Sequence, residues 1–228
     1  MKRTEGIINN LLFETKFQVL KLLNLGNRLT RNSKIKNYFK THEKIKIHFG
    51  GGSEKLDGFL NTDILGKIPI NISKKLPFPD QSVDIIYSCH VIEHLYYKDF
   101  KFFMKEAHRV LKEDGLHIIM TPSLEKLFEI LYHKEELKPI LLRGHEKLAR
   151  EKLNPALLIN KMIHIYYGHR FLHDFESIYN VALRAGFSKI KKISFGEIPD
   201  VVIKEYAQYR ANRGMRWKLE TETFLLGK

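Results

Sequence analysis

The chain has 228 residues, of which 43% are hydrophobic and 29% are charged, as in ordinary globular proteins. That length suffices for one sizeable α/β domain with an extension. The sequence contains no run of about 20 uncharged apolar residues, so no membrane span is expected. A single cysteine, Cys89, excludes an internal disulfide and a cysteine-based zinc site. The basic start lacks the apolar core of a signal peptide, and a cytoplasmic protein is therefore expected.

Positive charge is concentrated near the N-terminus. The formal net charge is +13, and residues 1–44 hold ten Lys/Arg against three Glu, which is +7. Such an asymmetry predicts an anionic partner: a membrane surface, a glycolipid or nucleic acid. Apolar residues predict a helix over 5–25 that ends at Gly26-Asn27, and a second basic helix over about 31–41. We interpret residues 1–43 as a basic amphipathic arm.

The apolar side of this arm allows two interpretations. It suits a membrane surface better than nucleic acid, which predicts peripheral membrane contact through residues 1–43. The alternative is that Ile8, Leu11, Leu12 and Phe17 pack on the sheet of the same chain or on a second subunit of a homodimer. The sequence alone does not choose between them.

Strands and helices alternate from about residue 44. The expected strands are 45–49, 59–64, 68–72, 83–88, 116–120, 189–195 and 220–226. A helix from about 91 restarts at Asp99 as its N-cap, a helical insert occupies about 123–168, and Asp174 caps a helix that ends at Gly186. This order predicts an α/β domain over 44–228 with a doubly wound, mostly parallel, seven-stranded Rossmann-like sheet. Its ligand site should lie beyond the carboxyl ends of the strands.

Three glycines, Gly50 to Gly52, follow the first predicted strand. Glycines at that place let the backbone approach a ligand closely and supply free N–H groups. The full dinucleotide pattern G-x-G-x-x-G is absent, because Lys55 occupies the position of the third glycine. Asp63 ends the second strand and could accept hydrogen bonds from two ribose hydroxyls. Taken alone, it is equally well explained as a turn residue.

Two longer segments carry a more specific pattern. Residues 76–95 read LPFPDQSVDIIYSCHVIEHL, and residues 107–116 read AHRVLKEDGL. With the glycine triplet, GFLNTD at 58–63 and GHRFLHDF at 168–175, the sequence resembles the type-11 family of methyltransferases, especially its small bacterial members of unassigned substrate. The resemblance extends over about residues 45–195. It implies a class I fold that binds S-adenosylmethionine.

The resemblance also implies which residues bind this cofactor. They are Gly50, Gly51, Gly52, Asp63, Ile64, Asn71, Ser88, Cys89 and His90. The glycines would lie against the methionine part, Asp63 would hold the ribose, and the last three would form the floor below the methyl group. Asn71 stands where the family usually has an aspartate near the adenine amine, and its carbonyl could accept the same bond. The sequence also departs from the family at Gly51, usually cysteine, and at 113–115, usually Pro-Gly-Gly.

Histidines around residue 90 are the candidate catalytic groups. His90 is the expected general base, because histidine titrates near neutrality and this one follows the fourth strand. His169 is the second candidate and His173 a rival. His90, Glu93 and His94 form H-x-x-E-H, a pattern of some zinc peptidases. Some methyltransferases hold magnesium with E-x-x-E-H at this place, and His169 could complete such a set. We expect no metal, with Glu93 and His94 serving as hydrogen-bonding anchors of the helix.

The expected function is S-adenosylmethionine-dependent O-methylation of a sugar, surface glycan or lipid-linked precursor, as in polysaccharide biosynthesis. A non-catalytic module that only binds the cofactor is the first alternative. A nicotinamide-dependent oxidoreductase is the second, and the truncated glycine loop argues against it. Nucleic acid is a disfavoured substrate, because no Asn/Asp-Pro-Pro-Tyr/Trp pattern occurs. For Asp174 we favour a helix cap, and for Arg109 a structural ion pair.

Overall fold

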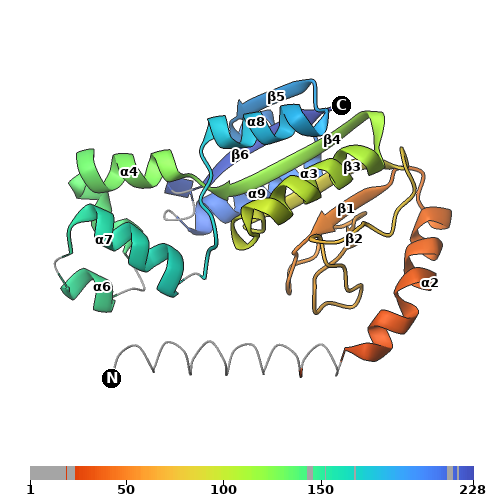
Figure 1. Ribbon diagram of the computed structural model, residues 1–228, viewed down its shortest axis with the longest axis horizontal. Coiled ribbons are helices and arrows are strands. Elements are labelled where there is room, and N and C mark those ends of the chain that lie inside the picture. Colours follow the sequence, from red (N-terminus) through yellow and green to blue (C-terminus); the bar gives the residue numbers. More distant parts are fainter. Residues whose placement is uncertain are drawn as a thin grey trace.

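The computed structural model describes residue 19 and residues 24–142, 146–151, 153–166, 168–214, 218–219 and 221–228. Most of the helix expected over 5–25 therefore lies outside the described residues. Within the described part, six strands form one sheet with helices on both of its faces (Figure 1). None of the helices in these ranges is long and apolar enough to cross a membrane.

The sheet has the strand order β2-β1-β3-β4-β6-β5. The strands are β1 (Lys46–Phe49), β2 (Leu60–Asn61), β3 (Val83–Cys89), β4 (Leu111–Pro122), β5 (Lys189–Ile193) and β6 (Thr221–Gly227). Strands β2, β1, β3 and β4 are parallel, whereas β6 is antiparallel to both β4 and β5. The chain leaves β1 toward β2 and returns to the other side of β1 as β3. This reversal confirms the doubly wound sheet and locates its ligand-binding edge at the carboxyl ends of β1 and β3.

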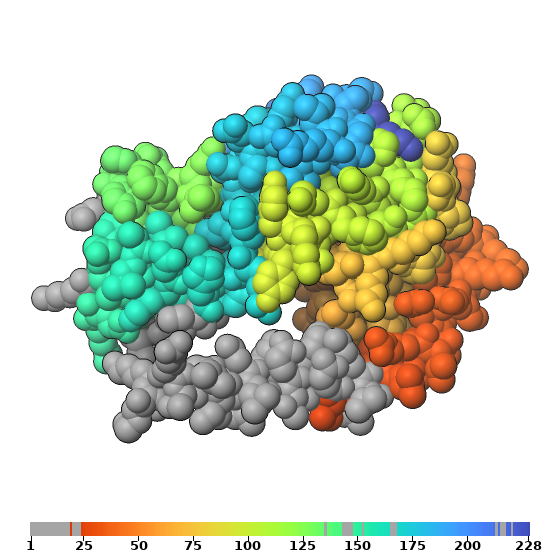
Figure 2. Space-filling view, viewed as in Figure 1, coloured from red at the N-terminus to blue at the C-terminus, as the bar shows by residue number. Residues whose placement is uncertain are grey.

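One face of the sheet carries α2 (Leu25–Thr41), α3 (Tyr97–Val110) and α8 (Phe175–Ala185). All three contribute to the largest group of buried apolar side chains. The α3 members recur every three or four positions, as a helix with one buried side requires: Phe100, Phe103, Met104, Ala107 and Val110. In the space-filling view, α3 and α8 form one continuous surface over the sheet (Figure 2).

The opposite face carries α9 (Val201–Arg213), whose Ile203 and Ala207 join a second buried group. Successive residues of β3 serve the two faces in turn: Ile86 packs in the first group and Tyr87 in the second. Because both faces are covered, the central strands are apolar along most of their length.

The predicted helical insert follows β4 and has its own core. It comprises α4 (Leu124–His133), η2 (Glu135–Leu137), α5 (Lys138–Leu141), α6 (Glu146–Arg150), α7 (Pro155–Asn160) and the π-helical turn η3 (Lys161–Tyr166). Its buried residues, such as Leu127, Leu131 and Leu158, pack on one another in a third apolar group. The insert projects beyond the carboxyl end of β4, beside the sheet (Figure 1).

The predicted third strand is absent from the described residues. Of the range 68–72, only Pro69 forms a bridge, in parallel with Asp63. Proline has no N–H to donate to a strand partner, which limits pairing there. Within the described residues the sheet therefore has six strands where we expected seven, and β2 is reduced to two residues.

Several element boundaries also differ from the expectation. Gly26-Asn27, the expected stop, lies in the first turn of α2, which follows Asn24. We expected Asp99 as the N-cap of α3. The N-cap is Tyr96, and Asp99 belongs to the first turn of the helix. Strand β4 begins at Leu111 rather than 116. Helix α9 was not expected, because its sequence shows little apolar periodicity.

Helix α8 begins and ends as predicted. The Asp174 side chain accepts a hydrogen bond from the backbone N–H of Ser177 (2.8 Å), and the pair forms a capping box. Gly186 follows the helix with φ +110°, which glycine adopts without steric cost. The helix-cap interpretation of Asp174 is therefore correct.

Candidate functional site

A pocket of about 610 Å³ lies at the carboxyl ends of β1, β2 and β3, and we name it pocket A. Five of the predicted site residues line it: Gly50, Asp63, Ile64, Asn71 and His90. They come from three strand ends and from the loop after β2, which the parallel arrangement brings together. Pocket A thus lies where the strand order predicts a ligand site, and its volume is within the range of small-molecule pockets.

The glycine loop after β1 needs glycine at two positions. Gly50 and Gly52 have φ of +67° and +55°, a region that residues with a side chain rarely adopt. A Cβ added to Gly50 would lie 2.3 Å from Cγ2 of Val91, so a side chain there would also clash with the chain after β3. At Gly52 an added Cβ would meet nothing within 4 Å. The loop is therefore tightly packed at its start and open at its end.

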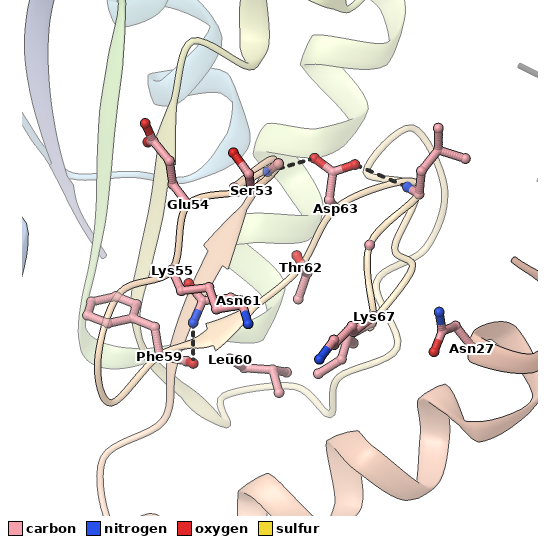
Figure 3. A pocket seen from close by; sticks show the side chains of 15 residues that line it. Asn27, Ser53, Glu54, Lys55, Phe59, Leu60, Asn61, Thr62, Asp63 and Lys67 are labelled. Carbon is pink, nitrogen blue, oxygen red and sulfur yellow. Dashed lines mark hydrogen bonds between the residues drawn. The ribbon is translucent and has the colours of Figure 1, made fainter. Parts of the chain in front are cut away.

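The Asp63 carboxylate joins this loop to the chain after β2. Its Oδ2 accepts a hydrogen bond from the Gly52 N–H (3.1 Å), and its Oδ1 accepts one from the Leu65 N–H (3.1 Å). Figure 3 shows both bonds, seen from a neighbouring hollow of about 510 Å³ that Gly51, Gly52 and Asp63 also line. Each carboxylate oxygen has a second lone pair, so Asp63 retains acceptor capacity for hydroxyl groups.

The rest of pocket A combines an apolar wall with one amide. Ile64, Ile70, Ile72 and Leu95 supply the apolar surface. The Asn71 carbonyl oxygen accepts a hydrogen bond from the Ser73 N–H (2.9 Å), which fixes the side chain in a turn and leaves its NH₂ group as a donor. We predicted that this amide would accept a hydrogen bond from the cofactor. In the structure it is better placed to donate one.

Two of the predicted floor residues point away from the pockets. The Ser88 side chain is 1% exposed, with its Oγ buried and without a hydrogen-bond partner among the described residues. Cys89 packs against the second buried group, and burial raises the pKa of its thiol to about 12. Neither residue lines pocket A. A contact of their side chains with the cofactor is not supported, because β3 directs them into the two core layers.

His90 differs from both of them. It follows β3 with φ +53°, and it lines pocket A. Its Nε2 lies 3.0 Å from Oγ1 of Thr221, and its Nδ1 lies 3.4 Å from Oε1 of Glu93. A left-handed conformation costs a residue with a side chain roughly 1–3 kcal/mol, and such strained residues concentrate at functional sites. The surrounding contacts hold the imidazole at the pocket edge.

The other predicted histidines are buried. His169 is 8% exposed and lies behind His94, with its Nε2 4.0 Å from Oε1 of Glu93. Burial lowers the pKa of His169 to about 4. His173 is fully buried between the rings of Phe100 and Phe171 and lines neither pocket A nor the neighbouring hollow. His173 is therefore not placed to act as a base.

Arg109 has the structural role that we favoured. Its guanidinium donates hydrogen bonds to Glu106 (2.7 and 2.8 Å) and to Asp80 (2.6 Å). It also binds the carbonyl oxygens of Leu76 and Phe78, so it holds the LPFPD turn against α3. The Glu106 carboxylate beside it raises the pKa of Arg109.

Sequence reasoning missed Thr221, the first residue of β6. This residue is 131 positions from His90, and no local pattern marks it. It also missed the pair Arg170 and Tyr96, which line pocket A and bind each other through a 2.8 Å hydrogen bond and a ring contact. Arg170 was part of the quoted GHRFLHDF segment, but nothing in that segment names its partner.

In the comparison with protein families, residues 66–119 match the model of the type-11 methyltransferase domain. This segment contains the LPFPD turn, β3, η1 (Ile92–His94) and α3. Over residues 66–119 the chain therefore resembles the type-11 methyltransferase domain.

Curated relatives match over a short segment. A probable S-adenosylmethionine-dependent methyltransferase of Mycobacterium tuberculosis is 45% identical over 49 residues, which cover 22% of this chain and 17% of the relative. A probable S-adenosylmethionine-dependent methyltransferase of Mycolicibacterium smegmatis is 43% identical over 49 residues, 22% of this chain and 18% of the relative. The match therefore spans about a sixth of these relatives.

Solved methyltransferases align over nearly the whole chain at low identity. A methyltransferase from Archaeoglobus fulgidus is 16% identical, covers 96% of this chain and 99% of its own, and gives a TM-score of 0.48. One from Thermotoga maritima, titled a possible histamine N-methyltransferase, is 14% identical over 95% of this chain and 96% of its own, with a TM-score of 0.44. The assignment of this fold therefore rests on the strand order of the chain itself.

The residues of pocket A fit the cofactor of the family. Asp63 in pocket A and the open Gly52 backbone in the neighbouring hollow suit a ribose and an amino acid part. The isoleucine wall suits a flat adenine ring. Pocket A and the neighbouring hollow thus offer surfaces that suit the three parts of S-adenosylmethionine.

Proposed function

We propose that this protein transfers a methyl group from S-adenosylmethionine to a hydroxyl group of an acceptor. The observation that carries the proposal is the convergence of Gly50, Asp63 and His90 on pocket A, in a chain whose residues 66–119 match the type-11 methyltransferase domain. The glycine loop would hold the methionine part, Asp63 the ribose and the isoleucine wall the adenine. The bound cofactor supplies an electrophilic methyl group on a sulfonium ion.

His90 would remove the proton of the acceptor hydroxyl. If its Nδ1–H donates to the Glu93 carboxylate, Nε2 carries the lone pair, as a general base requires. Thr221 would then donate its hydroxyl proton to Nε2 until an acceptor hydroxyl replaces it. Glu93 would act as a positioning residue, because its carboxylate fixes the tautomer and stabilises the imidazolium that forms.

The acceptor would bind in a third hollow, which Thr221 also lines. This hollow has a volume of about 410 Å³ and is lined by Thr221 and by three lysines, Lys126, Lys192 and Lys218. Lys126 donates to the Thr221 carbonyl (2.6 Å), and Lys192 is paired with Glu222 (2.8 Å). Anionic and hydroxyl-rich groups suit the ammonium groups that line this hollow. This supports a sugar, a surface glycan or a lipid-linked precursor as the acceptor.

The basic N-terminal segment would bring the domain to an anionic membrane surface. Of the +7 on residues 1–44, residues 1–23 contribute +2 and residues 24–44 contribute +5, so the charge resides mainly on and near α2. Juxtamembrane basic residues add about 1 kcal/mol each to binding of anionic lipids. A lipid-linked acceptor would be presented at such a surface.

Cofactor binding is the first test. S-adenosylhomocysteine should bind the full chain and raise its melting temperature, whereas NAD should not, because a ligand stabilises the state that binds it. Asp63→Ala should weaken S-adenosylhomocysteine binding by about 1–3 kcal/mol, the cost of poorly paired hydroxyls. Asp57→Ala, which removes an exposed carboxylate on the turn before β2, is the matched control.

The results distinguish the alternatives. Melting temperatures unchanged by S-adenosylhomocysteine but raised by NAD would replace the proposal with a nicotinamide-dependent oxidoreductase. Binding without transfer of a labelled methyl group to any sugar or lipid-linked acceptor would favour the non-catalytic module. Transfer to a hydroxyl, lost in Asp63→Ala and kept in Asp57→Ala, is the outcome that we expect.

A further inference from the structure

The H-x-x-E-H motif contains two residues that methyl transfer does not use directly, Glu93 and His94 on η1. The tertiary structure adds His169, which follows the insert. One ligand atom from each of the three residues lies within 4.8 Å of the other two. The His94 and His169 rings meet edge to face, with centroids 4.8 Å apart. Glu93 is fully buried and His169 is 8% exposed.

Backbone hydrogen bonds hold these residues together. The Glu93 carbonyl oxygen accepts from the N–H of Arg170 (2.7 Å) and from that of Phe171 (3.1 Å). The chain after the insert is therefore fixed to η1 at the residue whose side chain belongs to the cluster. The Arg170 guanidinium adds a second tie by binding the Tyr96 hydroxyl (2.8 Å). The three side chains are thus positioned by the fold itself.

The donor set is of a kind that binds a metal ion, because it combines two imidazoles with one carboxylate. Oε2 of Glu93 accepts a hydrogen bond from the Thr121 hydroxyl (3.1 Å), and an outer contact of this kind orients a ligand in protein metal sites.

We infer that Glu93, His94 and His169 form a binding site for a zinc-like divalent transition-metal ion. Two imidazoles and one carboxylate favour such an ion, whereas magnesium and calcium prefer a full set of oxygen ligands. Three protein ligands leave at least one coordination position open. Because His94 also lines pocket A, that position would lie toward the proposed methyl-transfer pocket. The expectation of no metal is revised on this geometry.

Cobalt(II) is the probe for this site, because its visible absorption reports nitrogen and oxygen coordination. The metal-free full chain, titrated with CoCl₂, should develop that absorption and saturate near one ion per chain. His94→Gln and His169→Gln should each weaken cobalt binding by at least about tenfold. His133→Gln, which removes an exposed imidazole at the end of α4, is the matched control and should bind like the wild type. Circular dichroism and melting temperature of each metal-free variant verify the fold.

Equal cobalt affinity in the wild type, His94→Gln and His169→Gln would overturn the inference, as would displacement of cobalt by an equal concentration of magnesium. If His169→Gln does not fold, the decision rests on His94→Gln, because His94 is the most exposed of the three residues. S-adenosylhomocysteine binding, measured in the same metal-free samples, separates this inference from the proposed function. Either site can be lost while the other is retained.

Discussion

At the scale of single residues, His90 combines a left-handed backbone with the side chain that we propose as the general base. Its left-handed backbone is tolerated because the N–H donates to the Met120 carbonyl (2.8 Å) and the ring lies between Thr221 and Glu93. A residue selected only for packing would be expected to avoid that conformation. The conformation motivates a test of whether the imidazole acts at the pocket edge.

The test of His90 requires a substitution that suits this backbone. Asparagine adopts positive φ more readily than alanine does, so His90→Asn removes the base without adding strain. We expect methyl transfer to fall about 10²- to 10⁴-fold, the usual contribution of a general base, and the limb of the pH–rate profile near the histidine pKa to disappear. S-adenosylhomocysteine affinity should change little. Full activity of His90→Asn with a hydroxyl acceptor would remove His90 from the mechanism.

At the scale of elements, α2 belongs to the domain more closely than the predicted boundary at residue 43 implies. Ile35 and Tyr38 are each 7% exposed and join the main core. The Tyr38 hydroxyl can donate a hydrogen bond to the backbone carbonyl of Gly58 (2.8 Å) or of Lys46 (2.9 Å). It also accepts a hydrogen bond from the Lys46 N–H (3.2 Å). The helix thus covers the start of β1 and the approach to β2.

Two truncations separate the roles of the N-terminal residues. Deletion of 1–43 should lower the melting temperature strongly or prevent folding, because it uncovers the apolar surface under Ile35 and Tyr38. Deletion of 1–23 leaves α2 in place and should retain cofactor binding. In thermal unfolding and vesicle flotation, a stable 24–228 chain that has lost affinity for anionic vesicles would support the membrane contact. If 24–228 still binds them, Lys36→Glu with Lys40→Glu, both exposed on α2, tests whether the helix carries the contact.

At the scale of the whole molecule, a histidine in the sheet links stability to pH. His117 is fully buried on β4, and neither ring nitrogen has a hydrogen-bond partner among the described residues. It lies against Phe103 and Phe187, with ring centroids 5.5 and 6.3 Å away. Burial lowers the pKa of His117 to about 3 and that of His173 to about 4. Both rings are therefore neutral in the folded protein at pH 7.

The direction of the pH effect follows from these values. Below the ordinary pKa of 6.5, the unfolded chain takes up protons that the folded chain does not bind until about pH 4. The free energy of unfolding should be highest above pH 6.5 and should fall by about 1.4 kcal/mol per pH unit for each histidine as the pH decreases toward 4. His117→Leu should flatten this decline and stabilise the protein at pH 7, because it removes an unsatisfied polar group. Urea unfolding between pH 4.5 and 7.5 checks this. The same slope in His117→Leu and in the exposed-site control His133→Leu would contradict it.

Features determined by a few neighbouring residues could be predicted from the sequence. The capping of α8 by Asp174, the end of that helix at Gly186, the glycine loop and the apolar β3 all depend on short-range sterics and hydrogen bonds. The alternation of strands and helices along the chain predicted a mostly parallel sheet. The parallel sheet in turn predicted the edge at which pocket A lies.

What the tertiary structure decided involves residues far apart in the chain. The contact of His90 with Thr221 crosses 131 positions, and the cluster of His169 with Glu93 forms only because the insert returns to η1. The burial of Cys89 depends on which core layer β3 directs it into, and no local pattern states this. Local preferences identify the residues able to do chemistry. Packing of the whole chain determines which of them meet, because long-range contacts are set by the joint burial of all elements rather than by any one segment.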